Sequence, residues 1–143
     1  MDEAAKAARR SRIMAELTPL RTRLSENINE RNRLVAQLER LRPARSKLSN
    51  YIDNALIVAR DIENCYQRIP DSRFKGERRL HLIERLDTVG SSFSTQCDRH
   101  HSNLGRLDRY IRAVHDRQET LTGTIRSQNN RIATLEAELR TLR

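Results

Sequence analysis

The side chains best suited to chemistry are a cysteine and two histidines close together, Cys97, His100 and His101. Cys97 and His101 are four residues apart, so on a helix they would share one face, as metal ligands often do. A structural zinc site needs four ligands. The segment expected opposite offers only Arg45, whose guanidinium would repel a cation, and Leu48, which cannot bind one. We therefore expect no metal, and we interpret His100 as a polar residue of a helix seam.

The remaining candidate groups give no support for catalysis. The carboxylate pairs Glu136 with Glu138 and Asp108 with Asp116 fall on solvated helix flanks. The sequence has no Gly-rich phosphate loop and no recognisable Ser/His/Asp set. We expect neither a catalytic residue nor a cofactor, and hence a chain without enzymatic activity.

These residues must be positioned by long helices, because two unbroken series of apolar residues recur in alternating steps of three and four. The first runs from Ile13 to Ile69 and is apolar at 14 of 17 positions; the second runs from Ile83 to Leu142 and is apolar at 14 of 18. So regular a repeat, with its period of 3.5 residues, keeps one seam of each helix facing a partner. The pattern predicts an all-α fold, a long antiparallel two-helix coiled-coil hairpin.

Folding the chain back at residues 70–76 would put residue n of the first arm opposite residue 145 − n of the second. This register matches seam with seam, and it pairs Asn27 with Gln118, Arg45 with His100, and Ala55 with Gly90. Two polar pairs would fix the register at a cost in stability, and the small pair would allow a close approach of the two backbones.

Boundaries follow from the prolines, the turn residues and the ends of the seams. We expect one domain over residues 1–143, with arm one at about 12–69, a turn at 70–76 and arm two at about 77–142. Residues 1–11 either prolong the first arm or fray. Pro19 predicts a kink or a fresh helix start at Thr18, and Pro43 predicts a kink near Leu41.

Composition agrees with a coiled coil: 33% of the 143 residues are charged, 3% are aromatic, and the net charge is +9. A basic surface favours acidic partners. Nucleic acid is disfavoured, because no basic region precedes the seam and no aromatic platform could stack bases.

Cys65 and Cys97 would be roughly 25 Å apart by helical rise, too far for a disulfide. With no signal peptide and no membrane-spanning segment in view, we expect a cytoplasmic protein.

A second, weaker apolar face lies off the seam, most densely near the turn. Its predicted partner-binding residues are Tyr51, Val58, Leu80, Leu82 and Val89. Association with another hairpin into a four-helix bundle would cover them. The alternative is that these are scattered surface residues with no partner.

The turn carries Phe74-Lys75-Gly76, an aromatic-x-Gly motif between two long helices. This arrangement resembles the WXG-type proteins of type VII secretion, with Phe74 and Gly76 in the places of the family's Trp and Gly. The chain length and the stretch from Leu38 to Leu48 look more like the YwqH-like relatives, small helical proteins encoded beside LXG toxins in Gram-positive bacteria. Two departures are the Phe at position 74 and the missing Tyr/Phe-x-x-x-Asp/Glu export signal in the tail.

The resemblance implies a non-enzymatic partner of an LXG-type toxin's helical N-terminal domain or of a sister hairpin, exported only in complex with it. A homo-oligomer is a further possibility left open by the sequence. The alternative function is a cytoplasmic coiled-coil scaffold or a basic nucleic-acid-associated protein.

Overall fold

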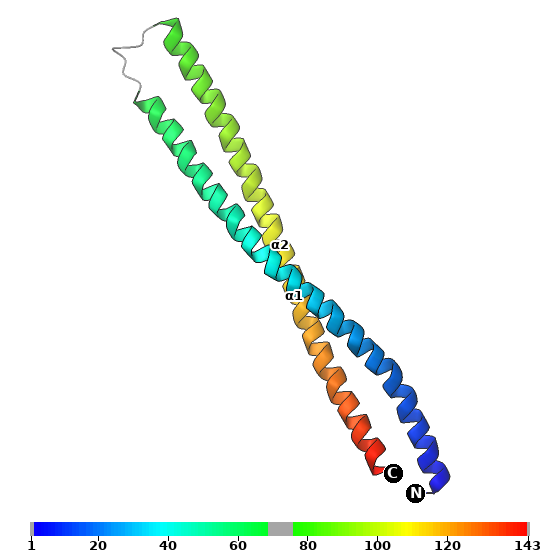
Figure 1. Ribbon diagram of the computed structural model, residues 1–143. Helices are drawn as coiled ribbons and strands as arrows, with labels where there is room; N and C mark the ends of the chain where they lie inside the picture. Colours follow the sequence, from blue (N-terminus) through cyan, green and yellow to red (C-terminus); the bar gives the residue numbers. More distant parts are fainter. Residues whose placement is uncertain (1, 69–75, 143) are drawn as a thin grey trace. The chain divides into compact units, whose positions relative to one another are not determined.

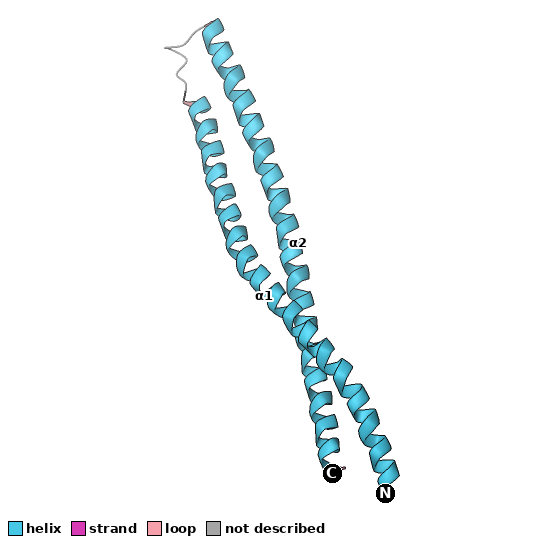
Figure 2. Ribbon diagram, turned by 45° about the vertical axis from the view of Figure 1, so that its right-hand side comes forward, coloured by secondary structure: helices cyan, strands magenta, loops and turns pink. Residues whose placement is uncertain are grey.

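The computed structural model describes residues 2–68 and 76–142, and 97% of these residues are helical. Helix α1 spans Glu3–Gln67 and helix α2 spans Glu77–Thr141, each with 65 residues. The two helices form an antiparallel hairpin, which confirms the predicted fold class. The chain divides into two compact units, unit 1 (Met1–Arg40 with Arg112–Arg143) and unit 2 (Leu41–Ile111). Within each unit the two helices lie side by side (Figures 1 and 2).

The first arm is longer than the sequence indicated, and it is one continuous helix. Residues 3–11 are helical rather than frayed, and α1 continues through both Pro19 and Pro43, so a fresh start at Thr18 is wrong. The Thr18 hydroxyl donates a hydrogen bond of 3.1 Å to the Met14 carbonyl in the turn before the first proline. Each proline removes one backbone donor. That local cost is smaller than the gain from seam residues that pack on both sides of Pro19, such as buried Leu17 and partly buried Leu20.

The core of unit 1 is a cluster in which seam residues of both helices meet. Ile13, Leu17, Leu135 and Leu142 are buried there, and three further seam residues pack against them: Leu20, Ile132 and Leu139. A guanidinium nitrogen of Arg10 donates to the carbonyl of Leu142 in the same region. These contacts place residue n opposite residue 152 − n, one heptad away from the expected 145 − n.

The register residues therefore have other partners than the sequence predicted, and all three predicted pairs are wrong. Asn27 donates to the side-chain oxygen of Gln128 at 3.1 Å, whereas Gln118 donates to Thr122. The Arg45 guanidinium pairs with Asp108 at 2.9 Å. In the new register Ala55 lies opposite Cys97, and Gly90 lies opposite Ile62.

The error has a physical cause in the period of the seam. A shift of seven residues still matches seam with seam, so the apolar pattern alone cannot separate the two registers. The expected register, 145 − n, sets Leu17 against Gln128. The observed register, 152 − n, sets Leu17 against Leu135, and both of these leucines are buried. Matching polar residues across the seam was a weaker criterion than filling the core.

A crosslinking experiment separates the two registers. In a chain whose natural cysteines are replaced by alanine, we expect Leu17→Cys with Leu135→Cys to be joined by a short bifunctional thiol reagent. The matched pair Leu17→Cys with Gln128→Cys should react poorly, because residues 128 and 135 are about 10 Å apart along α2. Non-reducing electrophoresis and peptide mass mapping give the readout. Preferential crosslinking to position 128 would restore the 145 − n register.

Unit 2 has a thinner core than unit 1. Its buried apolar residues are Ile52 and Cys97, among the described residues, whereas unit 1 buries eight. Gln67 ends α1 opposite Arg85, so the first two turns of α2 extend past the end of α1 (Figure 1). Gly76 precedes α2 with a φ of +83°, a left-handed conformation that favours glycine. Phe74 and the rest of the predicted turn lie outside the described residues.

Candidate protein-interaction surface

On one side of the seam, most of the flanking positions in unit 1 are charged. In heptad notation the seam occupies positions a and d, and position g is the residue just before each a. In an antiparallel pair, g residues of the two helices lie beside each other. Three interhelical ion pairs of unit 1 join such residues: Arg9 with Glu138 at 2.6 Å, Glu16 with Arg131 at 2.7 Å, and Glu30 with Arg117 at 3.2 Å. In each pair residue n lies beside residue 147 − n.

The pair of Arg9 with Glu138 lies at the partly exposed edge of the seam and changes the pKa of both groups. The hydrogen bond and charge of Glu138 raise the pKa of Arg9, and the hydrogen bond from Arg9 lowers the pKa of Glu138. A carboxyl whose pKa is lowered in the folded state stabilises the fold when the pH is above the pKa that the group has in the unfolded chain. That contribution is lost as the pH falls through the lowered value. Because these charged side chains pair with each other, this flank of unit 1 needs no partner protein to neutralise them.

The same flank changes character in unit 2, although both seams continue. In the described helices of unit 2 no residue at position g is charged, and Ala44, Gln96, Asn103 and Tyr110 occupy it nearest to unit 1. Toward the end where α1 stops, position g is occupied by Tyr51, Val58 and Cys65 on α1 and by Leu82 and Val89 on α2. We call these five residues the apolar flank. The relation 147 − n places Val58 beside Val89 and Cys65 beside Leu82. Tyr51, Val58, Cys65 and Val89 are exposed and Leu82 is partly buried.

Exposed apolar side chains are concentrated in unit 2 more generally. Of the nine large apolar side chains that are exposed among the described residues, seven belong to this unit: Tyr51, Leu56, Ile57, Val58, Leu80, Val89 and Tyr110. Leu80 is 61% exposed, but it is two residues before Leu82 and falls at the flank on the other side of α2. We therefore leave it out of the apolar flank. Ile57 is not among the partner-binding residues predicted from the sequence, because its heptad position points directly away from the seam.

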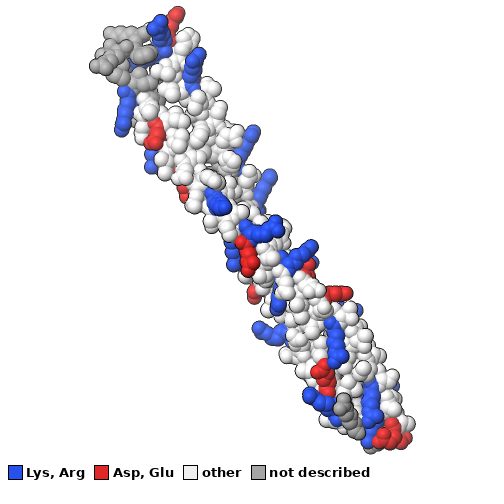
Figure 3. All heavy atoms as spheres, viewed as in Figure 1, with Lys and Arg blue, Asp and Glu red and all other residues white. Residues whose placement is uncertain are grey.

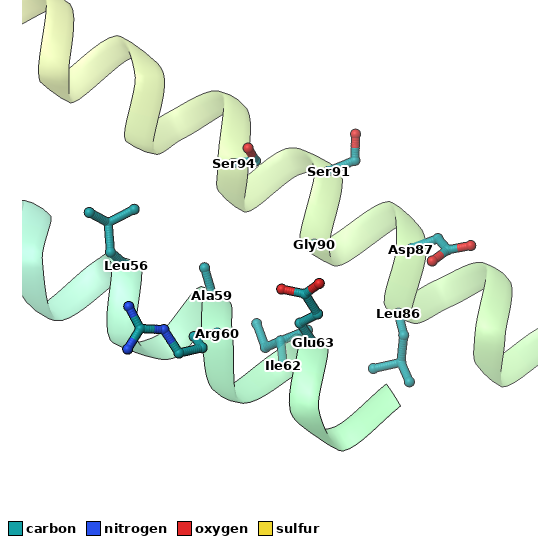
Figure 4. Close-up of a pocket in the computed structure, with 10 residues that line it drawn as sticks. All are labelled: Leu56, Ala59, Arg60, Ile62, Glu63, Leu86, Asp87, Gly90, Ser91 and Ser94. Atoms are coloured by element: carbon teal, nitrogen blue, oxygen red, sulfur yellow. The ribbon is translucent and has the colours of Figure 1, made fainter. Parts of the chain in front are cut away.

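A cavity of about 630 Å³ opens between the helices of unit 2 on the side away from the apolar flank. Its lining includes Ala59, Ile62 and Glu63 of α1 and Leu86 and Gly90 of α2 (Figure 4). Figure 4 shows Ala59 and Glu63 projecting from α1 toward the turn of α2 that carries Gly90. A Cβ atom added at Gly90 would meet nothing within 4 Å, so the predicted close approach at this glycine is wrong. The cavity exists because small residues in the seam leave the space unfilled.

This geometry predicts opposite effects at two glycines. Gly90→Ala should raise the free energy of unfolding by about 1 kcal/mol, because alanine is favoured in a helix interior and the added methyl meets no obstacle. Gly76→Ala should lower it by about 1 kcal/mol, because φ there is positive. Urea unfolding followed by circular dichroism measures both. Destabilisation by Gly90→Ala would instead indicate a backbone approach at that position.

The candidate metal ligands are not brought together. Cys97 is buried in the seam, whereas His100 and His101 are exposed. Among the described residues, no three His, Cys, Asp or Glu side chains gather in a way that could hold a metal ion. The same residues include no helix apolar enough over a sufficient length to cross a membrane.

Comparison with known proteins adds no relative to this description. Nothing matches the chain among protein-family models, curated proteins or solved structures.

Proposed function

We propose that this chain is a non-enzymatic protein-interaction module in which unit 2 binds helices of another protein through the apolar flank. The observation that carries the proposal is the change at one heptad position. Charged g residues pair between the helices of unit 1, whereas the same position in unit 2 holds exposed Val58 and Val89. Apolar residues at a, d and g together are typical of helices that pack on more than one neighbour.

The size of the exposed apolar set supports a binding role over scattered surface residues. Single exposed apolar residues are common in proteins and need no explanation. A group placed side by side on two adjacent helices is different, because contiguous apolar patches mark interaction sites. A helical partner laid along the groove between α1 and α2 would complete a three- or four-helix bundle.

The most specific form of this proposal names the helical N-terminal domain of an LXG-type toxin, or a sister hairpin, as the partner. It is supported by the resemblance to type VII secretion proteins and by the hairpin fold that such proteins share. In this form the protein would act in the cytoplasm, cover apolar helices of its partner and leave the cell only in complex with it.

Co-expression with the products of neighbouring genes tests the proposal. We expect one of them to co-purify with this chain in a fixed ratio and to elute with it as a single species in size-exclusion chromatography. An adjacent gene for an LXG-type toxin would support the specific form. If no neighbour binds and the chain is instead retained on DNA with a steep dependence on salt, a basic nucleic-acid-associated protein is the better assignment.

A further inference from the structure

We infer that the apolar flank takes an amphipathic helix whose apolar face is edged with Asp and Glu on the side that meets α2. This inference rests on the proposed function and adds the chemistry of the partner. It follows from the extent of the apolar flank and from how charges are distributed around it.

The face that includes the apolar flank is large enough for a specific complex. In unit 2, α1 continues from Leu41 to Gln67, which corresponds to about 40 Å at helical rise, and two adjacent helices are about 20 Å wide. Such a face offers roughly 800 Å² for contact, about what one partner contributes to a standard protein interface. Val58 and Val89 are exposed on the same side of the two helices, so a ridge of a third helix laid along that side would cover both.

Arginines border this face along α2. Heptad position c lies next to g on the outer side of the helix, and in unit 2 it is occupied by Arg78, Arg85, Arg99 and Arg106, with Ser92 as the one interruption. All four arginines are exposed, and none forms an ion pair with another described residue. Figure 3 shows basic side chains at intervals along the outer edge of this part of α2.

Acidic residues of α2 lie on the opposite edge. Position b, next to the flank that carries the cavity, holds Glu77, Glu84 and Asp98 in unit 2, with Ser91 and Gly105 as interruptions, and that flank itself carries Asp87 and Asp108. The charges of α2 are thus separated, with basic residues beside the apolar flank and acidic residues on the other side. A helix docked on the apolar flank meets guanidinium groups along α2, so acidic residues at its edge would be favoured.

The same distribution argues against a second copy as the occupant. A second copy seated on the apolar flank would bring its own arginine row, or the mixed row of Lys47, Asn54, Asp61 and Arg68 on α1, against these arginines. Neither row supplies an acidic edge. Nucleic acid would use the arginines but would leave Val58 and Val89 uncovered.

Two synthetic peptides test the inference with the full chain. Both form an amphipathic helix of four heptads with the same leucine ridge, one edged with Glu and the other with Lys. We expect the Glu peptide to bind roughly tenfold or more tightly than the Lys peptide in fluorescence anisotropy at low salt. Arg85→Glu with Arg99→Glu should remove this preference. The control Arg112→Glu with Arg126→Glu changes as much charge at exposed sites of unit 1 and should leave it intact.

Several outcomes would overturn the inference. Equal binding of the two peptides, or no binding of the Glu peptide, would refute the charge rule. Sedimentation as a dimer that Val58→Asp with Val89→Asp dissociates would make a second copy the occupant. Binding to phosphatidylserine vesicles without binding to the Glu peptide would make a membrane surface the ligand. If a neighbouring gene product still co-purifies in any of these cases, the proposed function stands and only the partner's chemistry is wrong.

Discussion

Leu38→Asp is expected to unfold the paired helices of unit 1. Leu38 is 5% exposed in the seam of α1, and the register places it opposite Val114 of α2, which is also buried. The substitution removes a packed side chain and puts a carboxylate into an apolar layer without a described cation opposite, at a cost of about 4 kcal/mol or more. That is a large share of the roughly 5–15 kcal/mol by which domains are stable. Thermal unfolding followed by circular dichroism at 222 nm should show a much lower midpoint.

Val58→Asp provides the matched control, because it introduces the same carboxylate on the same helix at a side chain that is 46% exposed. Its effect on the free energy of unfolding should stay within about 0.5 kcal/mol. Equal loss of stability in the two variants would mean that Val58 belongs to the core of the hairpin. The assignment of seam and flank would then be wrong.

The seam itself could be predicted from the sequence, because burial of one helix stripe imposes a period that the residues display directly. Ile13, Leu17, Leu34 and Leu38 recur in that period and are buried. The register could not be predicted in the same way. It depends on which of several seam-to-seam matches fills the core best. The packing of Leu17 with Leu135 decides it, together with the hydrogen bond from Arg10 to the carbonyl of Leu142.

Two predictions from single residues, proline as a helix breaker and glycine as a mark of close helix approach, were wrong because packing between the helices had the larger effect. Pro19 was expected to kink the arm or to start a new helix at Thr18, yet α1 continues through it, because one lost hydrogen bond weighs less than the seam contacts on either side. Gly90 was expected to mark a close approach, yet it lies opposite a cavity. Both expectations treated a single residue as informative by itself, whereas its meaning depended on the side chains facing it.

The candidate surface was partly predictable for the same reason. Off-seam apolar residues such as Tyr51, Val58 and Val89 stood out in the sequence, and they are exposed in the structure. That Leu80 lies on the other flank from Leu82 follows from their heptad positions, whereas the neighbours of each residue across the two helices depend on the register.

Val58→Asp combined with Val89→Asp is expected to abolish binding of the protein that co-purifies with this chain. Both side chains are about half exposed in the free hairpin, at 46% and 50%, so the fold should tolerate the change. Covering one such side chain in a complex is worth about 1.5–3 kcal/mol, and each new carboxylate would also need to be desolvated. The double variant should therefore bind at least about a hundredfold more weakly. Titration calorimetry with the purified partner measures the loss, and circular dichroism verifies that the helices remain.

Ile57→Asp combined with Leu80→Asp is the matched control for that experiment. These side chains are 54% and 61% exposed, so the same number of exposed apolar groups is converted to carboxylates within unit 2, but away from the apolar flank. Binding should change by less than about tenfold, because neither residue lies on the side where Val58 and Val89 are exposed. If the control abolishes binding while the flank variant retains it, the partner occupies the other side of unit 2. The cavity between Ala59 and Gly90 would then be its docking site, since that cavity opens on the flank where Leu80 lies.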